Sequence, residues 1–265
     1  MPEVLEELLK IARRAAAMAA GVHRRARKGS FDIETKASQA DLVTAVDREA
    51  EKQLVASIRD ARPNDSILGE EGANLTGTTG VRWILDPLDG TTNFIYGYPA
   101  HSVAVGVEID GKRVLGVVHD TYHNRVYAGV LSGGADCDGH PIKVRTEPAL
   151  ARALIGTGFL PTLEVRDAQG EILRRLLPQV RDVRRSGCPS LDLCAVASGA
   201  LDGFYESGLG LWDIAAGAAI AEAAGATVVE LQSALLPNPV VVAANAQLFK
   251  NFVAALAEAG AVTIS

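Results

Sequence analysis

The chain has 265 residues, enough for one large domain or two small ones packed together, and its 48% of hydrophobic residues can form a substantial core. The net charge of −6 gives no broad attraction to nucleic acid, so affinity for phosphate would have to come from a local site. Three cysteines without a CxxC pair, no signal-peptide layout and no apolar run as long as a membrane span lead us to expect a cytoplasmic protein.

The first third of the chain predicts two helices separated by a polar segment. Apolar residues recur at helical spacing over residues 2–27, and the basic residues 23–28 suit a solvated helix C-terminus. Residues 31–42 are polar and predict a loop or a short hairpin. A capping-box-like start at Thr44 to Asp47 then predicts a helix through Ile58, and a short strand follows at residues 66–68.

The rest of the chain mixes predicted strands with predicted helices. The strands are expected at residues 102–108, 114–118, 125–130, 141–144, 153–157, 203–206, 227–229 and 240–244. The helices are expected at residues 170–180, 191–198, 212–224 and 247–258. This mixture predicts an α+β fold of layered sheets and helices, in two tightly packed halves at residues 1–145 and 146–265.

The most informative stretch is W-I-L-D-P-L-D-G-T-T-N-F at residues 83–94. Its apolar beginning predicts a buried strand, and Asp86 should lie at the strand exit because a residue before proline is pushed to extended geometry. Gly90 permits a tight turn, and a helix is expected to start at Thr91. Asp86 and Asp89 would then lie next to free backbone N–H groups, which predicts a metal-dependent phosphate site.

Three other positions with acidic residues at strand or helix ends have simpler explanations when each is taken alone. Asp47 can support a helix N-terminus, and Asp213 can be the first-turn acid of the helix that follows Trp212. Glu70 and Glu71 can be solvated loop charges.

Histidine and cysteine give weaker signals. His119 and His123 have the spacing of a helical zinc pair, but they lie between β-like runs and are expected on a hairpin surface. Cys188 has no histidine near it in the sequence, so a buried thiol is favoured over a nucleophile.

With L-W-D-I-A-A-G at residues 211–217 also in view, the chain resembles the inositol monophosphatase family of Mg²⁺-dependent, lithium-sensitive phosphatases. The match also includes Lys36, residues 41–47 and 69–72, and the pair Tyr205 and Glu206, in the family's order over nearly the whole chain. The resemblance implies an αβαβα sandwich, a homodimer, a phosphate monoester as substrate and two to three Mg²⁺ ions per active site.

The resemblance also implies a role for each matching residue. Glu70, Asp86 and the carbonyl of Leu88 would hold the first Mg²⁺, and Asp86, Asp89 and Asp213 the second, with a weaker third ion near Glu70. Thr91, supported by Asp47, would help Glu70 activate the attacking water, and the backbone of Gly90 and Thr91 would bind phosphate. Lys36 would belong to a mobile loop, and the substrate would contact Asp89, Glu206, Gly187, Cys188 and Pro189.

One segment departs from the family's pattern and bears on the identity of the alcohol. Where inositol-type members usually carry Gly-Ser/Thr-Ala-Ala, this chain has Gly187-Cys188-Pro189-Ser190. A thiol is a weaker hydrogen-bonding group than a hydroxyl, and Pro189 has no N–H.

The expected reaction is hydrolysis of myo-inositol 1-phosphate. The alternatives within the family are histidinol phosphate, fructose 1,6-bisphosphate and 3′-phosphoadenosine 5′-phosphate as substrates. A rival of another class is a binding role with RNA or the transcription machinery, for which the basic residues 24–28 are the one feature. A complete set of metal ligands favours the enzyme.

Overall fold

The computed structural model describes residues 2–27, 33–35, 42–146 and 149–263, and for residues 33–35 and 42–44 it describes the backbone alone. Lys36 lies outside the described residues. The helices are α1 (Glu3–Ala26), α2 (Ala45–Ala61), α3 (Thr91–Tyr96), α4 (Leu163–Leu176), α5 (Pro189–Ala197), α6 (Leu211–Ala223) and α7 (Ala246–Ala259), with short 3-10 turns η1 (Leu150–Arg152) and η2 (Leu177–Gln179). Among the described residues, no helix combines the length and the apolarity that crossing a membrane requires.

The strands form a large sheet, a smaller sheet and a short antiparallel hairpin of β1 (Ile33–Thr35) and β2 (Leu42–Thr44). The large sheet contains β3 (Ser66–Gly69), β4 (Asn74–Leu75), β5 (Val81–Asp89), β6 (Ser102–Ile109), β7 (Lys112–Asp120), β8 (Arg125–Val130), β9 (Gly134–Cys137) and β10 (His140–Ile142), in the order β10-β9-β8-β7-β6-β5-β3-β4. The smaller sheet contains β11 (Leu154–Thr157), β12 (Asp182–Arg184), β13 (Gly203–Ser207), β14 (Ala226–Leu231) and β15 (Val240–Asn245), in the order β12-β11-β13-β15-β14.

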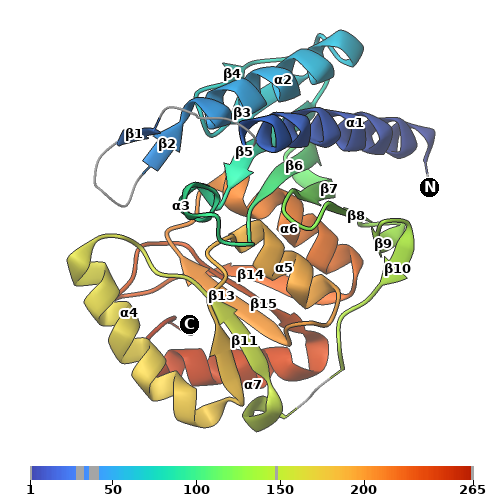
Figure 1. Cartoon of the computed structure of the whole chain (residues 1–265). Coiled ribbons are helices and arrows are strands. Elements are labelled where there is room, and N and C mark those ends of the chain that lie inside the picture. Colours follow the sequence, from blue (N-terminus) through green and yellow to red (C-terminus); the bar gives the residue numbers. More distant parts are fainter. Residues whose placement is uncertain (1, 28–32, 36–41, 147–148, 264–265) are drawn as a thin grey trace.

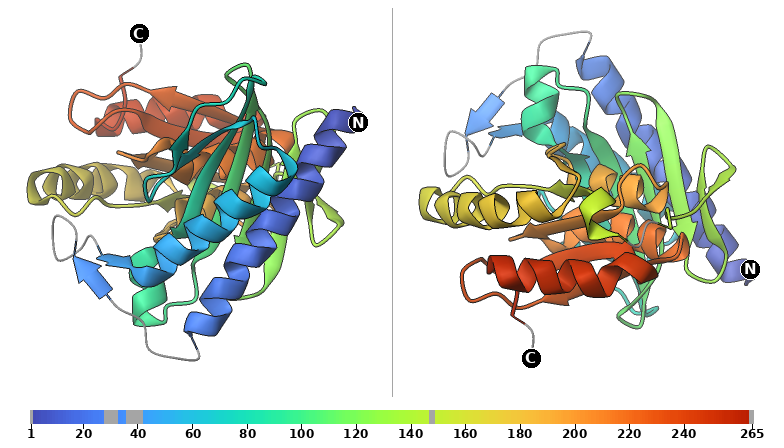
Figure 2. Two further views of the ribbon diagram at one scale, coloured as in Figure 1. Left: turned by 90° about the horizontal axis from the view of Figure 1, so that it is seen from above. Right: turned by 90° about the horizontal axis from the view of Figure 1, so that it is seen from below.

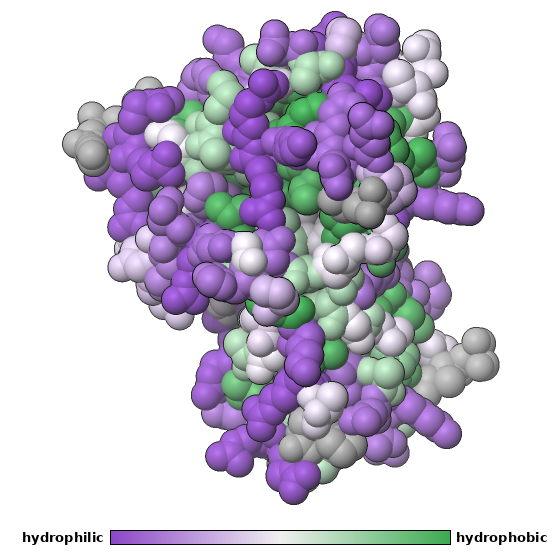
Figure 3. Space-filling model, turned by 90° about the vertical axis from the view of Figure 1, so that its right-hand side faces the viewer, coloured by the Kyte–Doolittle hydropathy of each residue, from purple (hydrophilic) through white to green (hydrophobic). Residues whose placement is uncertain are grey.

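Helices and sheets stack in five layers (Figure 1). α1 and α2 pack on β5, β6 and β7, and they lie side by side across the large sheet when it is seen from above (Figure 2). α5 and α6 form the middle layer, which contacts strands of both sheets, and α4 and α7 close the far face of the smaller sheet. The predicted α+β class and the αβαβα sandwich are therefore confirmed. Hydrophilic side chains cover much of the face shown in Figure 3, and hydrophobic ones are visible between them, mainly across its middle.

Three glycines let α6 lie directly on the large sheet. Gly106 on β6 pairs with Gly116 on β7, which in turn pairs with Gly129 on β8. A Cβ atom at Gly116 would lie 2.2 Å from the carbonyl oxygen of Ala216 in α6. Contacts this close need positions without side chains, so the glycines set the depth at which α6 packs.

Most predicted elements are present, and the differences have local reasons. α4 begins at Leu163, well before the expected residue 170. Gly170 lies inside the helix, since a single glycine weakens a helix without ending it. β9 and β12 were not predicted because they are short and lack a buried alternating face. We propose that residues 1–145 and 146–265 form one unit, because α5 and α6 of the second half pack on strands of the first.

Candidate metal and phosphate site

β5 carries the central motif, and it runs further than predicted. Asp86 was expected at the strand exit, but the strand continues to Asp89 through an irregularity in its pairing with β6. Asp86 lies opposite Ala104 and Asp89 opposite Ser102, so three steps on β5 match two on β6. Side chains three apart on a regular strand face opposite sides, and this bulge brings the two carboxylates to the same side. Pro87 fits there because it has no N–H to pair.

Three carboxylates converge at this bulge. Asp86, Asp89 and Asp213 each present an oxygen, and these oxygens all lie within 4.8 Å of one another. Asp213 stands in the first turn of α6, where its Oδ2 accepts a hydrogen bond from the backbone N–H of Gly210 at 2.6 Å. Asp213 is therefore the first-turn acid of α6, as the simpler explanation from the sequence proposed, and it is also a member of the acidic cluster.

The charges of this trio are poorly balanced by the protein alone. Burial, with the charges of Glu70, Asp89 and Asp213, raises the pKa of Asp86 well above its ordinary value. Burial also raises the pKa of Asp89, and burial with the charge of Asp89 raises the pKa of Asp213 to about 7. The buried Oδ2 of Asp86 has no hydrogen-bond partner within the part of the chain that the structure describes. An unpartnered carboxylate oxygen among three acids fits a divalent cation with oxygen ligands.

Glu70 lies beside this trio because β3 and β5 are parallel. Gly69 is opposite Leu85, so Glu70 follows at the level of Asp86 and raises the pKa of that carboxyl by its charge. Glu51 on α2, which the sequence analysis did not assign to the site, accepts hydrogen bonds from the backbone of the loop after Glu70, including Glu71 N at 2.9 Å. A buried charge on the same helix face as buried apolar residues was the available signal.

Asp47 and Thr91 also lie near the trio. Asp47 on α2 is buried, and its charge contributes to the raised pKa of Asp86. Thr91 donates its hydroxyl to the carbonyl oxygen of Leu88 at 3.0 Å. Gly90, with φ of +84°, is the N-cap of α3, and a Cβ there would lie 2.7 Å from the carbonyl oxygen of Ala100. Only glycine suits this turn.

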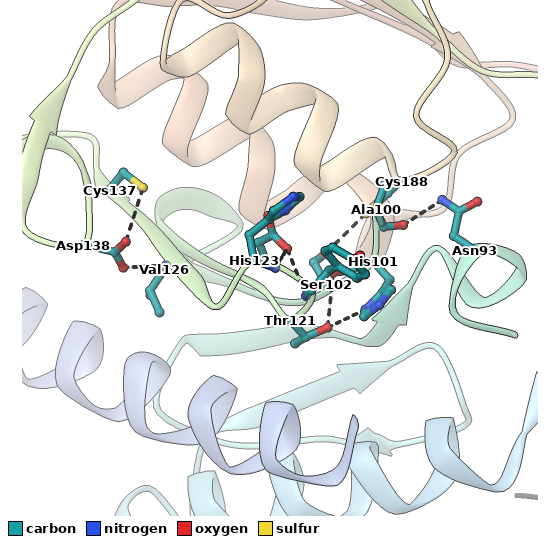
Figure 4. Close-up of polar contacts among 12 residues, drawn as sticks. Asn93, Ala100, His101, Ser102, Thr121, His123, Val126, Cys137, Asp138 and Cys188 are labelled. Atoms are coloured by element: carbon teal, nitrogen blue, oxygen red, sulfur yellow. Dashed lines mark hydrogen bonds and ion pairs between the residues drawn. The ribbon is translucent and has the colours of Figure 1, made fainter. Parts of the chain in front are cut away.

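The start of α5 holds Asp89 rather than facing open solvent. Cys188 is fully buried, and its Sγ lies 3.1 Å from Oδ2 of Asp89 (its surroundings appear in Figure 4). Ser190 donates its backbone N–H to the same oxygen at 2.8 Å, and its hydroxyl is 2.7 Å from that of Ser102. Pro189 is the first residue of α5, where its missing N–H costs nothing.

Glu206 lies on β13 of the smaller sheet, near enough to Asp89 and Asp213 for their charges to act on it. Its carboxylate lies over the backbone of Gly158, where a Cβ atom would meet both carboxylate oxygens. Burial, with the charges of Asp192 and Asp89, raises the pKa of Glu206 well above its ordinary value. Asn93, also unassigned from the sequence, donates to the carbonyl oxygens of Ala100 and Ser186 and so ties α3 to the segment before α5.

The two paired histidines behave differently from each other. His123 lies in the turn between β7 and β8 and contacts Asp120 at 2.8 Å, as expected of a hairpin surface. His119 is buried on β7, so its expected surface position was wrong. Helices α1 and α6 cover the two faces of β7, so residues 115–120 are all buried, which the spacing of the two histidines alone did not reveal.

Comparisons with known proteins agree with this fold and this acidic site. The model of the inositol monophosphatase family matches residues 4–261. The chain therefore belongs to the inositol monophosphatase family and is a phosphatase of that family.

Individual relatives carry two kinds of name. The chain is 44% identical over 213 residues to an inositol-1-monophosphatase SuhB of Mycobacterium tuberculosis, which covers 77% of this chain and 73% of the relative. It is 36% identical over 255 residues to a protein named Nus factor SuhB in Pseudomonas aeruginosa, covering 93% and 94%. A solved structure of suhB from Bartonella henselae superposes with a TM-score of 0.87 at 31% identity, covering 94% of this chain and 98% of that one.

Proposed function

We propose that the protein hydrolyses a phosphate monoester, with myo-inositol 1-phosphate as the favoured substrate, in a Mg²⁺-dependent reaction. The observation that carries this proposal is the trio of buried Asp86, buried Asp89 and half-buried Asp213, in which one oxygen of Asp86 has no hydrogen-bond partner among the described residues. Mg²⁺ prefers oxygen ligands, and bound cations would lower the pKa of water and neutralise the phosphate charge. We assign two to three ions to the site.

Each residue of the site is assigned a role in binding metal, water or phosphate. Glu70, Asp86 and the Leu88 carbonyl would hold one ion, and Asp86, Asp89 and Asp213 would hold the other. Thr91, supported by Asp47, positions the attacking water together with Glu70, and the backbone of Gly90 and Thr91 receives the phosphate at the start of α3.

Recognition of the alcohol is assigned to Glu206 and to the backbone of Gly187, Cys188 and Pro189. A carboxylate can accept hydrogen bonds from the ring hydroxyls of inositol, and the inositol assignment rests on this match. The test is phosphate release from inositol, histidinol, fructose and nucleotide phosphates, with and without Mg²⁺. The inositol assignment fails if myo-inositol 1-phosphate reacts far more slowly than histidinol phosphate.

Replacement of Cys188 tests what its side chain contacts. Burial, with the charge of Asp89, raises the pKa of the Cys188 thiol well above its ordinary value, so the thiol keeps the proton that it donates to Asp89. We expect Cys188→Ala to raise the half-saturating Mg²⁺ concentration by about tenfold, and Cys188→Ser to stay near wild type. A rise in KM for the ester without a change in Mg²⁺ dependence would instead indicate a side-chain contact with substrate.

The acidic trio predicts how Mg²⁺ stabilisation depends on pH. In the metal-free protein the pKa of Asp213 rises from 3.8 to about 7, so its protonated form stabilises the fold fully below 3.8 and this contribution is lost as the pH rises through about 7. Mg²⁺ binds the deprotonated form. Saturating Mg²⁺ should therefore raise the unfolding temperature more at about pH 8 than at about pH 5.5. Calorimetric scans at both values check this, and an equal rise at both would contradict it.

A binding role with RNA or the transcription machinery is kept as a second candidate because two relatives, in Pasteurella multocida and Pseudomonas aeruginosa, are named Nus factors. Cells that carry Asp86→Asn separate this role from catalysis. If the phenotype of cells lacking the protein is still rescued by a variant without phosphatase activity, the binding role is supported.

We further propose a cytoplasmic homodimer that is inhibited by lithium, in line with the family resemblance. Sedimentation and a lithium titration of phosphate release test the last two points.

A further inference from the structure

A second buried polar cluster lies between α1 and the large sheet, on the side away from α6. His23, near the end of α1, is 1% exposed, and His101, just before β6, is fully buried. Thr121 stands between them, with its Oγ1 3.0 Å from His23 Nδ1 and 2.6 Å from His101 Nδ1 (His101 and Thr121 are drawn in Figure 4). Buried imidazoles that are joined through one hydroxyl form a network in which each proton has a defined place.

The two ends of this network fix the direction of every hydrogen bond. At one end His23 Nε2 lies 3.0 Å from the carbonyl oxygen of Pro87, which can only accept. At the other end Arg27 Nη1 lies 3.0 Å from His101 Nε2, and a guanidinium can only donate. Burial with neighbouring positive charge lowers the pKa of His23 to about 3 and that of His101 to about 4, so both rings are neutral at pH 7.

The tautomers follow from these constraints. A neutral His101 that accepts from Arg27 carries its proton on Nδ1 and donates it to Thr121 Oγ1. The Thr121 hydroxyl has two acceptors within reach, the carbonyl oxygen of His101 at 3.2 Å and Nδ1 of His23 at 3.0 Å. Nδ1 of His23 is the nearer of the two, and it can accept because that ring carries its proton on Nε2. The hydrogen bonds of this network thus all point the same way, with donation passing from Arg27 through His101, Thr121 and His23 to Pro87. Every nitrogen of the two histidine rings has a partner.

The hydrogen-bonded network ends at the Pro87–Leu88 peptide group, which also contacts the acidic cluster. The carbonyl oxygen of Pro87 and the N–H of Leu88 belong to one planar peptide unit. The oxygen accepts from His23, and the N–H donates to Oδ1 of Asp86 at 3.0 Å. Any rotation that broke the first bond would swing the second away from Asp86. The other carboxylate oxygen of Asp86, Oδ2, has no hydrogen-bond partner among the residues that the structure describes, so it is available to a cation.

We infer that His23 is a positioning residue for the metal site, which acts through the Pro87–Leu88 peptide to hold the Asp86 carboxylate in one orientation. This inference rests on the proposed metal-dependent function. Pro87 lies in the bulge of β5, where strand pairing with β6 is interrupted. The neighbouring helix α1 therefore supplies a constraint that the sheet does not.

The experiment measures metal binding without substrate. Mn²⁺ is titrated into the full-length protein and followed by electron paramagnetic resonance, and the Mg²⁺ dependence of phosphate release is measured separately. We expect His23→Leu, which removes both ring nitrogens, to weaken Mn²⁺ binding about 10- to 100-fold, with a matching rise in half-saturating Mg²⁺. His23→Gln retains a donor and should recover most of the affinity. Thr121→Val should give a smaller loss in the same direction.

Ile172→Val is the matched stability control, because it removes a buried methylene from α4 beneath the smaller sheet and leaves the metal loop untouched. Its Mn²⁺ affinity should equal that of wild type. If His23→Leu lowers the unfolding temperature but binds Mn²⁺ like wild type, the inference is overturned. Should that variant fail to fold, unchanged Mn²⁺ affinity in Thr121→Val overturns it equally. Absence of phosphatase activity in wild type with intact Mn²⁺ binding would count against the proposed function alone.

Discussion

Asp86→Asn should lower Mg²⁺-dependent phosphate release by roughly 10³-fold, which corresponds to about 4 kcal/mol of transition-state stabilisation. The substitution keeps the shape of the side chain but removes the charge from the oxygen that lies buried without a hydrogen-bond partner in the described part of the protein. Asp86 is also the ligand assigned to both ions, so its loss should weaken both. Phosphate release over a Mg²⁺ titration measures the effect.

The same variant should fold at least as well as wild type when no metal is present. Burial and the charges of Glu70 and Asp89 already disfavour the ionised form of Asp86, so a neutral amide removes repulsion. Asp167→Asn on the exposed side of α4 is the matched control and should change neither activity nor stability. Mg²⁺-dependent hydrolysis within about tenfold of wild type in Asp86→Asn would sink the metal assignment.

Gly116→Ala should destabilise the protein by about 3 kcal/mol, which lowers the unfolding temperature by roughly 6–12 °C. The added Cβ would lie 2.2 Å from the carbonyl oxygen of Ala216 and 2.8 Å from its Cα. These are backbone atoms in the middle of α6, so the helix itself has to move. Because Asp213 stands in the first turn of α6, the half-saturating Mg²⁺ concentration should also rise.

Gly170→Ala should change stability in the opposite direction from Gly116→Ala, although both replace glycine with alanine. Gly170 lies inside α4, and an added Cβ would meet nothing within 4 Å. Replacing glycine with alanine in an open helical position should stabilise the protein by about 0.5–1 kcal/mol. Thermal unfolding of both variants measures these effects. If Gly116→Ala unfolds at the same temperature as wild type, the glycines on β6, β7 and β8 do not set how closely α6 packs.

Two contacts from outside the acidic trio hold its carboxylates in place. The acidic trio is held from two sides: Asp89 by the start of α5, and Asp86 by a peptide that His23 fixes from α1. The groups that make these two supporting contacts, the backbone N–H of Ser190 and the imidazole of His23, have no assigned role in the reaction itself. Both act on the carboxylates that are assigned to metal, which is where a small change of orientation has the largest effect on affinity.

Local pattern was enough to predict the main elements and the central motif. The apolar run before Asp86, the turn at Gly90 and the alanine-rich helix after Trp212 follow from residues close together in the chain, and periodicity is a local property. The family resemblance then named Glu70 and Asp213 as partners of the motif. The raised pKa of Asp86 in the structure places their charges near that carboxyl.

The sequence by itself thus determined the α+β class, the order of the elements and the presence of an acidic motif suited to metal and phosphate. Only the tertiary structure decided how the carboxylates meet and what holds them. The bulge that turns Asp89 to the side of Asp86 depends on pairing with β6, and the depth of α6 depends on glycines that lie opposite one another on three strands. The contact of the Cys188 thiol with Asp89 and the anchoring of Pro87 by His23 join residues distant in the chain, and no local period encodes such contacts.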